Sequence, residues 1–174
     1  MIGLDTLENQ AKTVYLSIGS NLGNKHINIE FAKFKLQSYK IKIIKCSSNY
    51  ETPSWPNEKN PTFINIVLKV KTSLSLFKLH QICNLIEKDL GRKRSKKNAP
   101  RTCDIDIIDY DQKILKNKNE KNLTLPHPRM DKRNFVLLPM FEISKSWIHP
   151  QKKKNIKKLI NLLNINSLIS IKQI

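Results

Sequence analysis

The segment CDIDIIDYD, residues 103–111, decides the fold of this chain. Successive side chains of a β-strand point to opposite faces, so Asp104 and Asp106 share one face while Ile105 and Ile107 share the other. Alternation of this kind, in a run rich in isoleucine, predicts a strand. It is the fourth strand predicted along the chain, and it completes an order of elements that specifies one architecture.

Three further strands are predicted before it. Residues 13–20, TVYLSIGS, are rich in β-branched and aromatic side chains, and residues 41–52 and 62–72 alternate between apolar and polar side chains. Helices are predicted for residues 26–39, after the first strand, and for residues 73–91, after the third. The order β-α-β-β-α-β predicts a ferredoxin-like α+β fold, in which the helices pack on one face of an antiparallel sheet.

The two helices carry different signals. Ser75 is the expected N-cap of the second helix, and Gly91 is its expected C-terminal stop. The first helix has apolar residues at roughly helical spacing, and we expect them to form its buried stripe. They are Ile27, Phe31, Phe34 and Leu36.

Length and composition indicate one globular domain. The 174 residues are 39% hydrophobic, which is enough for a single core. No apolar run approaches the roughly 18 residues of a membrane span, and the first residues lack the pattern of a secretory signal. The cysteines Cys46, Cys83 and Cys103 are odd in number and widely spaced, so we expect reduced, inert packing residues. We therefore expect an unprocessed cytoplasmic protein, and we expect a monomer.

The net charge of +18 raises the question of nucleic-acid binding. Phosphate neutralisation dominates the affinity of nucleic-acid-binding proteins, and their single-strand surfaces interleave basic with aromatic side chains. Here the lysine excess extends along the whole chain, and the interleaved aromatic residues are missing. The pattern disfavours nucleic acid as a partner, and an anionic small substrate accounts for the charge equally well. A ferredoxin-like RNA-binding module remains the alternative of a different class.

The two aspartates follow directly on a cationic loop. Residues 91–101, GRKRSKKNAPR, contain six basic side chains. Two carboxylates on one face can share hard cations such as Mg²⁺, and arginine or lysine compensates the charge that develops on a transferred phosphate. This combination indicates transfer from a nucleoside triphosphate. A two-metal nuclease built on the same aspartates is the rival enzyme, and acids on an exposed strand can also serve solubility alone.

Four ordered motifs resemble one known family. They are YLSIGSNLGN (15–24), NPTFINIVLKVKTSL (60–74), IEKDLGRKRSKKNAPRTCDIDII (86–108) and LTLPHPRMDKRNFVLLPMFEI (123–143). Together they resemble 6-hydroxymethyl-7,8-dihydropterin pyrophosphokinase, an enzyme of folate biosynthesis that transfers pyrophosphate from ATP to the pterin hydroxymethyl group and releases AMP. The resemblance covers residues 13–147, which leaves residues 1–12 as an extension and residues 148–174 as a basic segment, expected to form a helix on the same domain.

The resemblance implies a set of roles on the nucleotide side. Asp104 and Asp106 would bind two Mg²⁺ ions, and Arg92 and Arg101 would assist transfer. ATP would be the co-substrate. The residues implied to contact it, Arg94 from a closing loop among them, are Glu87, Arg94, Ile107, Thr124, His127 and Arg133. The loop departs from the family pattern, because it reads KKNAPR where the family has a tryptophan before Gly-Pro-Arg.

The resemblance also implies a pocket for the second substrate, hydroxymethyl-dihydropterin. The amide of Asn65 can pair with the donor and acceptor edge of a pterin, and an amide inside an apolar strand needs such partners. Phe63 and Phe135 would stack on the two sides of the pterin ring. Without the resemblance, both would be interpreted as ordinary core residues. The other residues implied to contact or cover the pterin are Gly19, Thr52, Pro53 and Trp55.

Overall fold

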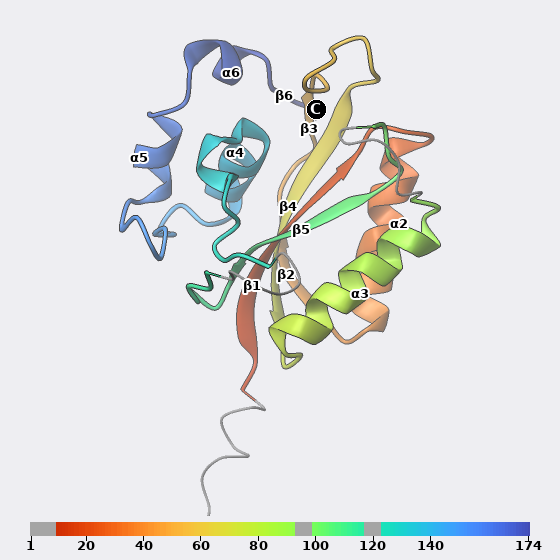
Figure 1. Cartoon of the computed structure of the whole chain (residues 1–174), viewed down its shortest axis with the longest axis vertical. Helices are drawn as coiled ribbons and strands as arrows, with labels where there is room; N and C mark the ends of the chain where they lie inside the picture. Colours follow the sequence, from red (N-terminus) through yellow and green to blue (C-terminus); the bar gives the residue numbers. More distant parts are fainter. Residues whose placement is uncertain (1–9, 93–98, 117–122) are drawn as a thin grey trace, which may run out of the picture.

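The structure is a computed structural model that describes residues 10–92, 99–116 and 123–174. Within these ranges, six strands form one antiparallel sheet (Figure 1). The strands are β1 (Lys12–Ser20), β2 (Lys42–Cys46), β3 (Tyr50–Thr52), β4 (Phe63–Thr72), β5 (Asp104–Tyr110) and β6 (Lys172–Gln173). Their order is β5-β1-β4-β3-β6, and β2 also pairs with β4. This arrangement confirms the predicted ferredoxin-like α+β fold.

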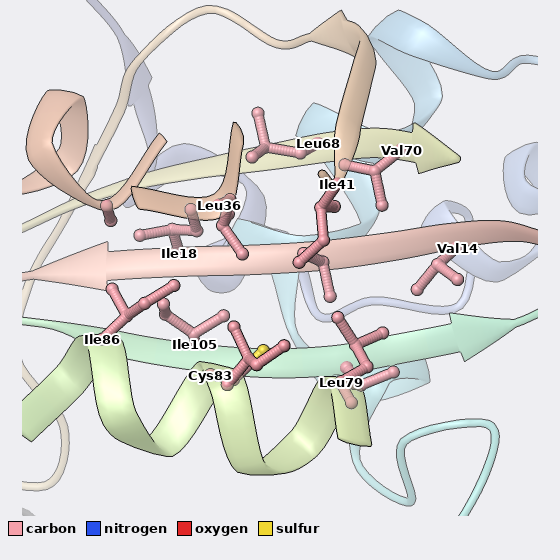
Figure 2. Packing of buried hydrophobic residues seen from close by; sticks show 14 of the residues in the cluster. Val14, Ile18, Leu36, Ile41, Leu68, Val70, Leu79, Cys83, Ile86 and Ile105 are labelled. Atoms are coloured by element: carbon pink, nitrogen blue, oxygen red, sulfur yellow. The ribbon is translucent and has the colours of Figure 1, made fainter. Parts of the chain in front are cut away.

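One face of the sheet is covered by α2 (Lys25–Ser38) and α3 (Leu76–Asp89). Figure 2 shows how Cys83 and Ile86 of α3 point toward Ile105 of β5, while side chains of β1 and β4 complete the layer. Isoleucine, leucine and valine make up most of this cluster, and burial of each such side chain contributes about 1.5–3 kcal/mol. The hydrophobic pattern of the strands thus fixes which face of β5 carries its aspartates.

The ends of α3 are set by the two residues predicted for them. The Ser75 side chain accepts a 3.3 Å hydrogen bond from the Lys78 N–H at the N-terminus. Gly91 follows the helix with φ +78°, a left-handed conformation that glycine adopts without a steric penalty. Because the helix ends there, Glu87 in its last turn and Arg92 just beyond it lie beside the start of β5.

The stripe predicted for α2 is wrong for three of its four members. Ile27 and Phe34 are 63% and 65% exposed, and Phe31 is 38% exposed. The helix instead buries Ile29, Ala32 and Leu36, of which only Leu36 was in the predicted set. The buried residues are smaller than the phenylalanines, so the choice of face follows close packing against the sheet rather than side-chain size.

The opposite face of the sheet is covered as well, which corrects the expectation of helices on one face. There α4 (Asn134–Ile143) packs against β4, and α5 (Ile156–Ile160) packs against α4 (Figure 1). These two helices and η1 (Met130–Lys132), which precedes α4, contribute side chains to the second apolar cluster. Tyr15, Val67 and Ile108 are the strand residues of this cluster. The central strands are therefore buried on both faces.

Two segments differ from their predicted form. Residues 41–52 form not one strand but two, β2 and β3, which lie along β4 in succession. The basic C-terminal segment forms two short helices and a strand rather than one helix: α5 packs Ile156 and Leu159 in the core, α6 (Ile165–Ile169) buries no residue, and β6 pairs with β3.

Two expectations drawn from composition are also tested. Cys83 and Cys103 are buried, whereas Cys46 is exposed, so the packing role predicted for Cys46 is wrong. Within the described ranges, no helix is both long and apolar enough to cross a membrane.

Candidate active site

Four residues on neighbouring strands line up across the sheet. Asp104 of β5 lies opposite Gly19 of β1, and Gly19 lies opposite Asn65 of β4. Asn65 in turn lies opposite Tyr50 of β3. Since adjacent strands are about 4.8 Å apart, Asp104 and Asn65 flank Gly19 at roughly 10 Å from each other. We call these four residues, Asp104, Gly19, Asn65 and Tyr50, the row. Gly19 has no side chain, so the row has a gap between the Asp104 carboxylate and the Asn65 amide.

Asp104 is paired with two arginines. Arg92 Nη1 lies 2.6 Å from Asp104 Oδ1, and Arg101 Nη2 lies 3.0 Å from Oδ2. Arg92 also pairs with Glu87, whose Oε1 accepts a 2.7 Å hydrogen bond from the Ile105 N–H. Burial lowers the pKa of Arg92, but Asp104 and Glu87 outweigh that effect, so its pKa is raised and the guanidinium stays charged.

Asp106 is paired with residues that precede α4. Arg133 Nη1 donates a 2.8 Å hydrogen bond to Asp106 Oδ2, and His127 Nε2 lies 3.7 Å from the same oxygen. Burial lowers the pKa of His127 in spite of the attraction of Asp106, so the imidazole is neutral at pH 7. Thr124, half-buried, lies three residues before His127. Both aspartates therefore face permanent cations.

The amide of Asn65 is buried and oriented. Its Nδ2 donates to Thr52 Oγ1 at 3.0 Å and to the Tyr50 carbonyl at 3.5 Å, and the residue is 4% exposed. Its Oδ1 lies over Gly19, where a Cβ atom would come within 2.9 Å of it. The acceptor of the amide therefore faces the gap in the row.

Two arginine–phenylalanine contacts border the same region. The Arg101 guanidinium lies over the ring of Phe63, 5.4 Å from its centroid, and the Arg133 guanidinium lies over Phe135 at 5.3 Å. The buried Arg101 Nε has no hydrogen-bond partner among the residues that the structure describes. A buried donor without a partner costs about 1–3 kcal/mol. Both phenylalanines are half-buried, and Phe135 also packs against the second cluster.

The chain belongs to the 7,8-dihydro-6-hydroxymethylpterin-pyrophosphokinase (HPPK) family. The model of this family matches residues 15–145. The resemblance predicted from the four motifs is thereby confirmed, together with the enzyme class that it implied.

The relatives in the HPPK family include proteins of similar length and much longer ones. The 2-amino-4-hydroxy-6-hydroxymethyldihydropteridine pyrophosphokinase of Aquifex aeolicus is 40% identical over 146 residues, which cover 84% of this chain and 89% of that protein. The Bacillus subtilis protein of the same name is 37% identical over 130 residues, which cover 74% of this chain and 76% of that protein. The folic acid synthesis protein fol1 of Pneumocystis carinii is 41% identical, but this chain spans only 19% of its length.

Solved structures agree on the fold. A Plasmodium falciparum HPPK-DHPS triple mutant with SDX-DHP superimposes with a TM-score of 0.75 at 19% identity. The match covers 95% of this chain and 48% of that chain. At 19% identity, the similarity to this structure supports the same fold and the same arrangement of helices and strands, but not the roles of individual residues.

Asn21 lies beside Arg101 in this candidate site and was not among the residues predicted from the sequence. It is 2% exposed, its Oδ1 accepts a 2.8 Å hydrogen bond from the Arg101 N–H, and its own N–H donates to the Arg101 carbonyl at 3.1 Å. Its Nδ2 donates to Ser54 Oγ and to the Pro61 carbonyl. Asn21 thus joins the main chain of Arg101 to the loop that follows Thr52. The only signal in the sequence was a polar residue directly after a buried strand.

The other predicted residues lie at different depths. Ile107 is 7% exposed and packs in the first core cluster, so only its main chain could contact a ligand. Thr52 is buried, Pro53 is exposed, and Trp55 is 77% exposed. Arg94 lies outside the described residues.

Replacement of Gly19 tests the gap in the row. In Gly19→Ala the new methyl group would lie 2.9 Å from Asn65 Oδ1, and Asn65 cannot yield easily because Thr52 holds its Nδ2. We expect the KM for the pterin to rise roughly tenfold and the affinity for ATP to change less than about twofold. Steady-state kinetics with each substrate varied measures both. Gly23→Ala is the matched control. The φ of +67° at Gly23 strains an alanine, so this variant should lower Tm, but its methyl group would not lie near Asn65.

The raised pKa of the Glu87 carboxyl group makes the stability of the fold depend on pH. Burial raises the pKa of Glu87 from 4.5 to about 7 against the opposing Ile105 N–H and Arg92. The folded state then binds a proton that the unfolded state releases, so this contribution is present below about pH 4.5 and is lost as the pH rises to about 7. We expect Glu87→Gln to gain stability relative to the parent over this range, by up to about 1.4 kcal/mol per pH unit in denaturant melts. A difference between Glu87→Gln and the parent that stays flat across this range would contradict the account.

Proposed function

We propose that this chain transfers a pyrophosphoryl group from ATP to 6-hydroxymethyl-7,8-dihydropterin, which yields AMP and the pterin pyrophosphate of folate biosynthesis. The observation that carries the proposal is the row across the sheet. The arginine-paired Asp104 and the amide of Asn65 flank the bare backbone of Gly19. A flat heterocycle recognised by the amide would have its hydroxymethyl arm directed toward the carboxylates.

The donor set fits Mg²⁺ that arrives with a nucleotide. Mg²⁺ is usually bound by one or two carboxylates together with waters and substrate phosphates. Asp104 and Asp106 supply two carboxylates with side chains 23% and 34% exposed, and no group of three or more His, Cys, Asp or Glu residues poised for a metal occurs in the described ranges. Asp104 and Asp106 would hold two ions, which would neutralise charge on the triphosphate and align it.

The residues of the chain then act by position and charge. The hydroxyl oxygen of the pterin attacks the β-phosphorus of ATP in line, the bond from this phosphorus to the α–β bridging oxygen breaks, and AMP leaves while the hydroxyl proton passes to solvent. Arg92 and Arg101 stabilise the charge that develops on the transferred group.

The nucleotide would lie on the Asp106 side. There Arg133 and the neutral imidazole of His127 offer donors beside the carboxylate, with Thr124 nearby in sequence. Glu87 would act on the nucleotide from the Asp104 side, through Arg92, which pairs with both carboxylates. Phe63 and Phe135 would stack on the pterin once the guanidinium groups leave their faces.

Product analysis tests the proposal. Incubation with ATP, Mg²⁺ and hydroxymethyl-dihydropterin should give AMP and a pterin pyrophosphate in equal amounts, separated by anion exchange. Formation of ADP, or consumption of ATP that does not depend on the pterin, would refute the assignment. RNA affinity that falls steeply with salt, without turnover of the pterin, would favour the RNA-binding alternative.

We further propose that residues 13–147 form the catalytic domain, with residues 1–12 as an extension and residues 148–174 packed on the same domain. We also propose that the chain acts as a cytoplasmic monomer. Light scattering of the purified chain at working concentration tests the oligomeric state.

A further inference from the structure

We propose that Glu142 is a positioning residue for the pterin side of the site. Glu142 lies in the last turn of α4, outside the residues that would touch either substrate. The inference rests on the proposed function, since its main readout is the affinity for the pterin.

The Glu142 carboxylate is the acceptor for one short stretch of chain. The Ser48 N–H lies 3.0 and 3.1 Å from its two oxygens, the Ser48 Oγ–H donates to Oε1 at 2.9 Å, and the Tyr50 Oη–H donates to Oε2 at 3.0 Å. Burial and the Glu142 carboxylate together raise the pKa of Tyr50 to about 12, so its hydroxyl stays protonated and remains a donor. Hydrogen bonds to a charged group contribute more than neutral ones.

The segment held by Glu142, residues 48–50, leads into β3, which holds the Asn65 amide of the proposed pterin pocket. Tyr50 is the first residue of β3, and its carbonyl accepts a hydrogen bond from Asn65 Nδ2. Thr52, the last residue of β3, accepts the shorter bond from the same Nδ2. A strand of three residues has few ladder hydrogen bonds of its own, so its position depends on such anchors.

Glu142 also connects the two halves of the site. The helix that carries it begins directly after Arg133, which holds Asp106, and ends at Ile143. The rigid α4 therefore spans from the carboxylate side of the site to the anchor of β3. We infer that Glu142 fixes where Thr52 and Asn65 stand relative to the aspartates, and that its loss loosens the recognition of the pterin.

Three variants test the inference. Glu142→Ala removes every one of these acceptors, Glu142→Gln keeps one carbonyl oxygen, and Tyr50→Phe removes a single donor. We expect the pterin KM to rise roughly tenfold, threefold and threefold or less, respectively, with kcat and the KM for ATP within about twofold of the parent. Glu30→Ala, which removes an exposed carboxylate paired with Lys33, should leave all three parameters unchanged.

The outcomes separate this inference from the proposed function. If the parent chain does not convert the pterin alcohol, the proposed function fails. If the parent is active, an unchanged pterin KM in Glu142→Ala, or equal changes in both KM values, overturns the positioning role. Amide hydrogen exchange gives a readout without turnover: residues 50–52 and 63–65 should exchange faster in Glu142→Ala, and unchanged exchange there also overturns the role. Should Glu142→Ala not fold, the same comparisons apply to Glu142→Gln and Tyr50→Phe.

Discussion

Asp104→Asn is expected to lower the single-turnover rate roughly a thousandfold, which corresponds to about 4 kcal/mol. The substitution keeps the shape of the side chain but removes the charge that would hold Mg²⁺ beside the transferred group. Rapid-quench measurement of AMP formation at saturating ATP and pterin gives the rate. Asp131→Asn, which removes a carboxylate paired with Lys152 away from the row, is the control and should retain nearly full activity.

The same variant should also lose stability without ligands. Crowding of Asp104 and Asp106 alone would suggest that removing one charge stabilises the fold. The structure instead pairs Asp104 with Arg92 and Arg101, so the amide leaves two guanidinium groups facing each other with less compensation. A Tm below that of the parent in metal-free buffer is expected, and a higher Tm would contradict the pairing.

Arg101→Ala is expected to slow the chemical step by about 2–4 kcal/mol, or roughly 30- to 1000-fold, with a much smaller loss of ATP affinity. Arg101 is anchored before any ligand binds, because Asn21 holds its main chain and Asp104 pairs with its guanidinium. A prepositioned donor acts on the transition state more than on the bound substrate. Single-turnover rates combined with equilibrium ATP binding separate the two effects. Arg92→Ala should behave in the same way.

The basic loop supplies the control for that prediction. Lys96, outside the described residues, belongs to the same cationic run of the sequence, and a charge that contacts no reacting group gains little from long-range attraction. Lys96→Ala should change either quantity less than about threefold. Equal, small effects at Arg101 and Lys96 would mean that the run only provides a diffuse positive field.

The sequence predicts well those features that depend on local periodicity. Alternation placed Asp104 and Asp106 on the face opposite Ile105, and the structure keeps that division because the isoleucine packs under α3. Capping chemistry placed the ends of α3 at Ser75 and Gly91, since both residues act within one turn of the chain.

Features that depend on tertiary packing could not be predicted from the local periodicity of the sequence. Phe31 and Phe34 have the spacing of a buried stripe, yet the sheet accepts the smaller Ile29 and Ala32. The helix α4 contains Pro139, which argues against a helix locally, and its surroundings in the second cluster override that signal. Asn21 and Glu142 act only through contacts with chain segments distant in sequence, which no periodicity reveals.

One isotope experiment tests the central claim most directly. With the hydroxymethyl oxygen of the pterin labelled with ¹⁸O, attack of that oxygen on the β-phosphorus predicts a pterin pyrophosphate that keeps the label and an AMP that carries none, both read by mass spectrometry. Loss of the label from the pterin product, or free pyrophosphate formed in its place, would contradict transfer to the pterin hydroxyl at this site.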